Sequence, residues 1–159
     1  MPIDGAHMNH KHALQHNIFK TIGTIADEAS MDCYVIGGFV RDYFLNKKSP
    51  KDIDIVVVGS GIALAKKVAS RLKGKPKVSI FKNFGTAMIK HRDLELEFVG
   101  ARKESYHHDS RKPIVEDGTL EDDQKRRDFT INALALSLNT ATFGDLLDPF
   151  DGLGDLNRK

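Results

Sequence analysis

Two neighbouring stretches, Ile36-Gly37-Gly38-Phe39-Val40-Arg41-Asp42 and Lys51-Asp52-Ile53-Asp54, decide the fold class of this chain. The first predicts a strand over residues 33–36 that turns at the two glycines into a short helix over residues 39–45. The second begins a strand over residues 52–58 that becomes apolar on both faces, which places it in the centre of a sheet. A strand-turn-helix unit beside a central strand predicts an α/β fold.

The Gly37-Gly38 turn has two interpretations. Glycine lets the backbone approach a phosphate closely, and the first N–H groups of the following helix are free to donate to one. Arg41 lies one turn further on, within reach of the same phosphate. The alternative is a plain strand-to-helix turn in which Arg41 pairs with an aspartate on the surface.

Asp52 and Asp54 form the second candidate. Side chains two residues apart on a strand share a face, with Cα atoms about 6.6 Å apart. Two carboxylates there can bind a hard divalent cation through oxygen, and without a cation their repulsion is costly. They also fit two exposed acids at the end of a strand, because Asp-x-Asp is a common pattern.

Acidic residues recur in Leu94-Glu95-Leu96-Glu97-Phe98-Val99. The alternation predicts a half-buried strand whether or not it has a function. Glu95 and Glu97 share a face, so either could complete a three-carboxylate metal site.

A basic run, Lys125-Arg126-Arg127-Asp128-Phe129-Thr130-Ile131-Asn132-Ala133, precedes a predicted helix. Asp128 suits the N-cap of that helix. Alternatively, Arg126 or Arg127 binds phosphate, while Asp128 and Asn132, four residues apart on one helix face, bind a ribose hydroxyl.

The remaining pattern is that of a mixed sheet with helices on one side. Periodicity predicts helices over residues 16–29 and 61–72, and strands over 78–81, 86–90 and 94–99 with a hairpin at 90–93. Residues 101–118 read as a long loop. Thr119-Leu120-Glu121-Asp122 resembles a capping box with Asp in place of Glu, and helical sequence then extends to about residue 138.

Composition narrows the function classes. The 159 residues suit one domain, and the net charge of +2 argues against a general nucleic-acid-binding protein. The single cysteine, Cys33, excludes a disulfide framework and a cysteine-based zinc site. No apolar run is long enough to span a membrane and no signal peptide is present, so we expect a cytoplasmic protein. We expect residues 1–8 to be an expression-tag remnant, 9–156 the domain, and 157–159 the start of a linker.

Taken together, these stretches resemble the head domain of bacterial class II tRNA nucleotidyltransferases and poly(A) polymerases, over about residues 34–156. The resemblance rests on the Gly37–Asp42 and Lys51–Asp54 stretches and on three others: Leu96-Glu97-Phe98-Val99-Gly100-Ala101-Arg102, Thr119 to Ala133, and Asp148-Pro149-Phe150-Asp151-Gly152. It implies a nucleotidyltransferase palm of the polymerase-beta type, an α+β fold with a mixed, mostly antiparallel sheet and helices packed on one side.

The resemblance also implies roles for particular residues. The implied magnesium ligands and catalytic acids are Asp52, Asp54 and Glu97. The implied nucleotide-binding residues are Gly37, Gly38, Arg41, Arg126, Arg127, Asp128 and Asn132, with Asp128 reading the ribose. Residues 103–118 correspond to a mobile loop of the family.

The implied reaction uses two Mg²⁺ ions to add CMP or AMP, from CTP or ATP, to the 3′ end of tRNA with release of pyrophosphate. In the family the base is selected in a neck region that follows the head. A poly(A) polymerase head is the nearest alternative. A non-catalytic nucleotide- or RNA-binding module on the same fold is another, although the retained Asp52, Asp54 and Glu97 speak against it.

Overall fold

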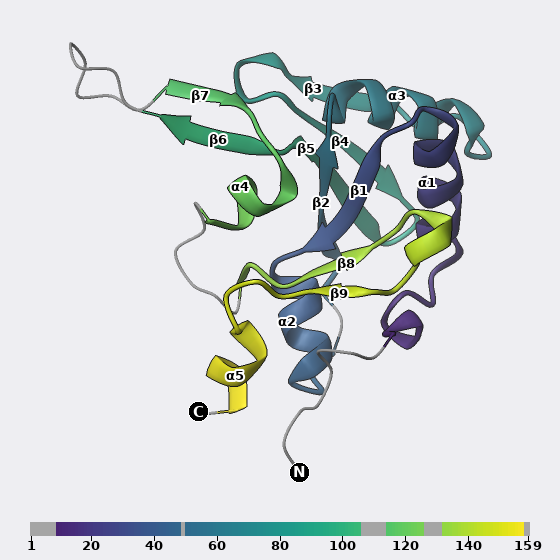
Figure 1. Ribbon diagram of the computed structural model, residues 1–159. Helices are drawn as coiled ribbons and strands as arrows, with labels where there is room; N and C mark the ends of the chain where they lie inside the picture. The colour runs from purple at the N-terminus through teal and green to yellow at the C-terminus, as the bar shows by residue number, and fades with distance from the viewer. Residues whose placement is uncertain (1–8, 49, 106–113, 126–131, 158–159) are drawn as a thin grey trace.

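The computed structural model describes residues 9–48, 50–105, 114–125 and 132–157 (Figure 1). Its α-helices are α1 (Asn17–Glu28), α2 (Gly38–Phe44), α3 (Gly61–Arg71), α4 (Leu120–Lys125) and α5 (Gly152–Asn157). Its strands are β1 (Asp32–Ile36), β2 (Asp52–Val58), β3 (Val78–Phe81), β4 (Thr86–His91), β5 (Leu94–Gly100), β6 (Arg102–Ser105), β7 (Ile114–Asp117), β8 (Ala135–Ser137) and β9 (Leu146–Leu147). Among the described helices, none has the length and apolar character required to cross a bilayer.

One seven-stranded sheet organises the molecule, in the order β3-β4-β5-β2-β1-β8-β9. Its pairings are antiparallel except that between β2 and β5, which is parallel. The expected mixed, mostly antiparallel sheet is therefore confirmed, and β2 is its central strand as predicted. The hairpin between β4 and β5 is confirmed as well, and Arg92 adopts a positive φ of 55° in its turn.

The two faces of the sheet differ. Ile53, Ile55 and Val57 of β2 join the main core with α1 and α3, which lie together on one side of the sheet (Figure 1). Val56, from the opposite face of β2, joins a smaller cluster to which α4 contributes Leu120. Asp52 and Asp54 alternate with the main-core residues, so they lie on the face away from α1 and α3.

Two element predictions were wrong. Residues 101–118 were expected to be a loop, but β6 and β7 pair within this segment as two antiparallel strands. Residues 106–113, between these strands, lie outside the described range, so the mobility expected of this segment stays a prediction. The helix expected to reach residue 138 is instead interrupted by β8, which pairs with β1. The segment 134–138 is buried on both faces, and such a continuous apolar run does not distinguish a strand from a helix.

The capping box at the start of α4 is confirmed. The Thr119 N–H donates to Asp122 Oδ2 at 3.0 Å, and the Asp122 N–H donates to Thr119 Oγ1 at 3.1 Å. The shorter Asp side chain thus performs the reciprocal capping usually done by Glu. The expected tag remnant at residues 1–8 and residues 158–159 of the expected linker lie outside the described range.

At Gly23, α1 packs directly against the backbone that follows β8. A Cβ at this position would lie 1.9 Å from the Leu138 carbonyl oxygen, immediately after β8. We therefore expect Gly23→Ala to lower the free energy of unfolding by about 1–3 kcal/mol, since neither backbone can move without disturbing the core. Urea denaturation measures this change. Thr24→Ala, on the exposed face of the same helix, serves as the control and should shift stability by less than about 0.5 kcal/mol.

Candidate active site

Strand β1 ends next to the beginning of β2, so the glycine turn that follows β1 lies there as well. Ile36, the last residue of β1, is paired with Asp54 of β2. Gly37 follows with φ 81° and ψ −141°, a conformation that residues with a side chain rarely adopt. A Cβ on Gly37 would lie 3.6 Å from Asp54 Oδ2, so the turn passes directly beside this carboxylate. The positive φ explains the glycine at this position, because residues with a side chain rarely adopt it.

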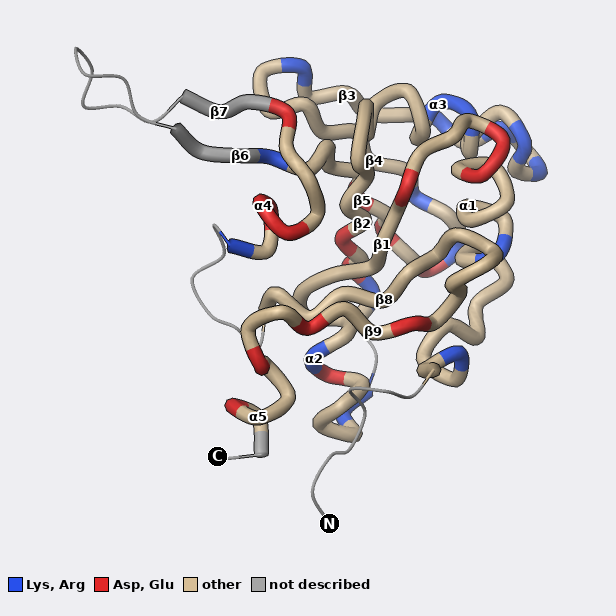
Figure 2. The backbone as a smooth tube through the Cα atoms, viewed as in Figure 1, with Lys and Arg blue, Asp and Glu red and all other residues tan. Residues whose placement is uncertain are grey.

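The parallel pairing of β2 with β5 brings the acids of the two strands together. Asp52 is in register with Glu95, and Asp54 is in register with Glu97. Figure 2 shows red, acidic segments next to the labels of β2 and β5. The pairing therefore gathers the carboxylates onto one face, next to the glycine turn.

Cross-strand neighbours on β4 distinguish Glu97 from Glu95. Lys90 lies opposite Glu95, whereas Met88, which carries no charge, lies opposite Glu97. Partial burial raises the pKa of the Glu97 carboxyl, and the charge of Asp54, a hydrogen bond with Asp54 and the charge of Asp52 raise it further. Glu97 thus interacts with the aspartate pair, and its role as a metal ligand, which the family resemblance implies, stays a prediction.

Arg41 is held by partners on two segments. Its Nε donates to Asp42 Oδ1 at 3.1 Å, and its Nη1 donates to Asn132 Oδ1 at 3.0 Å. Arg41 Nη2 lies 3.4 Å from where a Cβ on Gly38 would stand, so the guanidinium folds back over the start of α2. The structure thus joins Arg41 and Asn132, which lie 91 residues apart. The pairing with an aspartate is the one that the alternative interpretation of the turn described, whereas the contact with Asn132 was not predicted from the sequence.

The carboxylates suit a magnesium ion that is shared with a substrate. Among the described residues, no three side chains of His, Cys, Asp or Glu converge into a ready-made metal cage. Mg²⁺ is usually held by one or two carboxylates, with phosphates and water completing the octahedron. The donors Asp52, Asp54 and Glu97 are all hard oxygen ligands, and the contact between Glu97 and Asp54 concentrates negative charge that a cation would neutralise. These residues therefore fit magnesium bound together with a triphosphate.

Three of the predicted nucleotide-binding residues cannot be placed. Arg126, Arg127 and Asp128 lie outside the described residues, so their expected contacts with a nucleotide remain predictions. Cys33 is buried in the core, and desolvation raises the pKa of its thiol to about 12, with smaller contributions from Asp27 and Asp32. A thiol that stays protonated at neutral pH is unsuited to act as a nucleophile.

Residues 33–159 match the sequence family described as the poly A polymerase head domain. An A-adding tRNA nucleotidyltransferase of Aquifex aeolicus is 47% identical over 126 residues, which cover 79% of this chain and 15% of that protein. A CCA-adding enzyme of Streptococcus uberis is 38% identical over 134 residues, which cover 83% of this chain and 30% of that enzyme. The chain thus spans less than a third of the length of either relative.

Solved structures show the same fold. A tRNA nucleotidyltransferase complexed with a primer tRNA and an incoming ATP analogue superimposes with a TM-score of 0.73 at 43% identity, covering 85% of this chain and 36% of that one. A CCA-adding enzyme in complex with CTP superimposes with a TM-score of 0.74 at 37% identity, covering 89% of this chain and 30% of that one.

The raised pKa of Glu97 predicts how the metal-free protein responds to pH. A carboxyl whose pKa is higher in the folded state stabilises the fold below its unfolded pKa, and this contribution is lost as the pH rises through the folded value. We therefore expect Glu97→Gln to raise the thermal midpoint at pH 7 in EDTA, because it removes repulsion with Asp54. The difference from wild type should shrink as the pH falls from 7 through the raised pKa of Glu97, and it should be gone below the ordinary value of 4.5.

Glu95→Gln is the matched control. Glu95 lies on the same face of β5, but it lies opposite Lys90, so losing its charge should not raise the thermal midpoint. An equal stabilisation by both substitutions would mean that general repulsion on this face, rather than the pairing of Glu97 with Asp54, sets the effect.

Proposed function

Because the chain belongs to the poly(A) polymerase head-domain family, we propose that it is the catalytic head of a tRNA nucleotidyltransferase. This enzyme would transfer CMP or AMP from CTP or ATP to the 3′ end of tRNA. The observation that carries the proposal is the alignment of Asp54 with Glu97 beside the Gly37 turn. Carboxylates for a cation and free backbone N–H groups for phosphate are the two elements that nucleotidyl transfer requires at one place.

In the proposed reaction, the 3′-hydroxyl oxygen of the acceptor attacks the α-phosphorus. The bond between this phosphorus and the bridging oxygen breaks, and pyrophosphate leaves. Gly37 and Gly38 bring the backbone close to the triphosphate, while Arg41, held in place by Asp42 and Asn132, presents a preorganised cation to it. Arg126, Arg127 and Asp128 are assigned to the nucleotide by family resemblance.

Asp52, Asp54 and Glu97 would hold two magnesium ions. When bound, these ions would lower the pKa of the attacking hydroxyl and neutralise the charge on the phosphates. Burial raises the pKa of Glu97 most, and repulsion from Asp54 and Asp52 raises it further; a cation would relieve this repulsion, which supports the arrangement. The substrates proposed here occur in the cytoplasm, which we take as the site of action.

A poly(A) polymerase head is the nearest alternative, and the description of the matching family favours it. The carboxylates, the glycine turn and Arg41 would serve both reactions, because the chemistry at the α-phosphorus is the same. The similarity to tRNA-specific relatives supports tRNA as the acceptor. A purely binding role is less well supported, because it would leave the repulsion between Asp54 and Glu97 without a purpose.

We expect the double substitution of Asp52→Asn and Asp54→Asn to abolish the contribution of magnesium to nucleotide binding. In calorimetric titrations of CTP and ATP, magnesium should strengthen binding to the wild-type chain by at least about tenfold, or about 1.4 kcal/mol. The variant should bind equally weakly with and without the ion, because only the metal ligands are lost.

Asp32→Asn provides the control for that titration. Asp32 is an exposed acid paired with Val58, at the other end of β2, so its loss changes net charge without touching the site. Thermal melting should show that the double variant is still folded. An undiminished magnesium effect in the double variant would refute the assignment of these aspartates.

Nucleotide binding by the 159-residue chain should be nearly independent of the base. The turn, Arg41 and the carboxylates are suited to phosphates and metal, which CTP, ATP, GTP and UTP share. Their affinities in magnesium should therefore lie within about tenfold of one another, or about 1.4 kcal/mol. Addition of C and A to tRNA lacking its 3′ end should be very slow, since none of these groups positions the acceptor. A hundredfold preference for CTP and ATP, or efficient addition, would contradict this prediction.

A further inference from the structure

A hollow of about 770 Å³ lies at the opposite end of the sheet from the carboxylates. It is formed where β2 and β5 end, at Gly59 and Gly100, together with the turn before β4. Five residues along β2 separate Asp54 from Gly59, or about 16 Å at 3.3 Å per residue. The hollow is therefore separate from the proposed catalytic site.

The floor of this hollow is backbone. A Cβ on Gly61 would stand 3.0 Å from the carbonyl of Phe98, and one on Gly100 would stand 2.9 Å from the carbonyl oxygen of Gly59. These contacts explain the glycines, because the turn into α3 packs directly against the end of β5.

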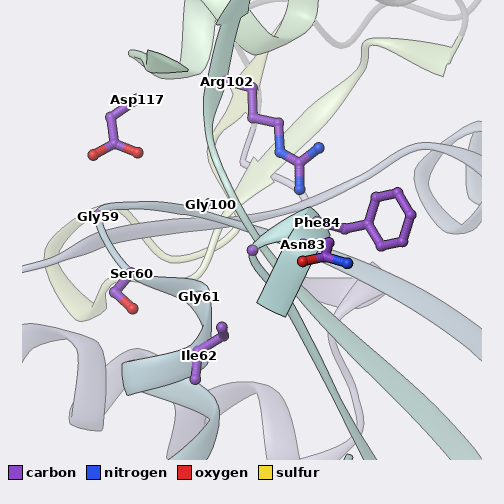
Figure 3. A pocket seen from close by; sticks show the side chains of 10 residues that line it. Gly59, Ser60, Gly61, Ile62, Asn83, Phe84, Gly100, Arg102 and Asp117 are labelled. Carbon is purple, nitrogen blue, oxygen red and sulfur yellow. The ribbon is translucent and has the colours of Figure 1, made fainter. Parts of the chain in front are cut away.

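An arginine and an exposed aromatic ring stand at the edge of this floor. The Arg102 guanidinium extends towards Asn83 and Phe84 (Figure 3), and its Nη2 lies 3.6 Å from where a Cβ on Gly85 would be. It makes no hydrogen bond or ion pair with any side chain that the structure describes. Phe84 is 64% exposed, the largest value among the exposed apolar residues of the described chain. Asp117 occupies a different part of the rim (Figure 3).

Phe84 also borders a second, smaller hollow. Ile80, Phe81, Lys82, Asn83 and Phe84 enclose a volume of about 360 Å³ along the edge strand β3 and the 3₁₀ turn Lys82–Phe84. Asn83 and Phe84 line both hollows. An aromatic ring between two open spaces can stack a planar group on either side.

The sequence segment that supplies most of the lining of these two hollows is rich in basic residues. Residues 55–92 contain nine of the chain's 24 basic residues and none of its 22 acidic residues. This segment forms most of β2 and all of α3, β3 and β4, and it supplies most of the lining of both hollows. Figure 2 shows blue segments on α3 and on the turns beside β3. Not all of these basic residues lie at the hollows, since Arg71 is paired with Glu28 and Lys90 lies opposite Glu95. The charged residues that line the two hollows are Lys82, Arg102 and Asp117.

We propose that this surface, defined by Phe84, Asn83, Lys82 and Arg102, binds unpaired nucleotides of an RNA strand. A base stacks on the Phe84 ring, the Asn83 amide bonds to a base edge, and Lys82 and Arg102 contact phosphates. Lys82 and Arg102 outnumber Asp117, the one acid that lines these hollows, which favours an anionic partner over a neutral apolar one. The proposal concerns a second contact with RNA and does not depend on nucleotidyl transfer.

The test is the binding of a fluorescein-labelled ten-nucleotide oligo(U) RNA to the 159-residue chain, followed by anisotropy in EDTA without nucleotide. Phe84→Ala should weaken binding by at least about fivefold, the usual loss for one stacked base. Phe84→Leu should weaken it similarly, because leucine keeps apolar bulk without a flat ring, whereas Phe84→Trp should preserve it. Because Phe84 is exposed, thermal melting should be unchanged in all three variants.

The electrostatic part is tested by salt dependence. Arg102→Gln should weaken binding and reduce the slope of log K against log salt by about 1, as expected for one lost phosphate contact. Lys20→Gln on the exposed face of α1, which changes net charge equally, should leave both unchanged. The double substitution of Asp52→Asn and Asp54→Asn should not reduce binding of this RNA, and Phe84→Ala should not reduce magnesium-dependent CTP affinity.

Three outcomes would overturn the proposal. The first is that the wild-type chain does not bind the RNA. The second is that Phe84→Leu binds as tightly as wild type, which would mean apolar contact rather than stacking. The third is concentration-dependent self-association that Phe84→Ala abolishes without changing RNA binding, which would make the surface an interface between copies of the chain.

Discussion

The parallel pairing of β2 with β5 is the constraint on which the arrangement of this head domain depends. It sets Asp54 level with Glu97, and two carboxylates are held in contact at the cost of mutual repulsion. The rest of β2 offsets that cost, because Ile53, Ile55 and Val57 are fully buried in the main core. A shift of one residue in this pairing would move Glu97 to the opposite face of β5 and bury it among apolar side chains.

The site is assembled from segments that are distant in sequence and adjacent in the sheet. Because β1 pairs with β2 on one side and β5 pairs on the other, the Gly37 turn and Glu97 reach Asp54 from opposite directions. Arg41 is then fixed by Asn132, which precedes β8, the strand on the far side of β1. Asp54 and Glu97 lie on paired strands, and Arg41 is held by hydrogen bonds to Asp42 and Asn132, so these groups are preorganised.

Sequence reasoning succeeded where the periodicity was clear and failed where burial removed it. The bounds of β2 and β3 were predicted to the residue, because glycines and charged residues mark their ends. Strand β8 was missed because Leu134 to Leu138 are buried on both faces. The choice between Glu95 and Glu97 depended on family resemblance, since alternation alone cannot show that Lys90 lies opposite one and Met88 opposite the other. The exposure of Phe84 was equally inaccessible, because an aromatic residue beside a predicted strand is normally assigned to the core.

The pairing of β8 with β1 also governs the order in which the chain can fold during its synthesis. Val35 pairs with Leu136, about a hundred residues later, and the Leu138 N–H donates to the Cys33 carbonyl at 3.0 Å. Until that late segment leaves the ribosome, β1 is an edge strand with unsatisfied hydrogen-bonding groups next to an uncovered core. Completion of the sheet is therefore postponed until nearly the whole head has emerged, and any earlier pairing of β1 with β2 leaves this edge open to other chains.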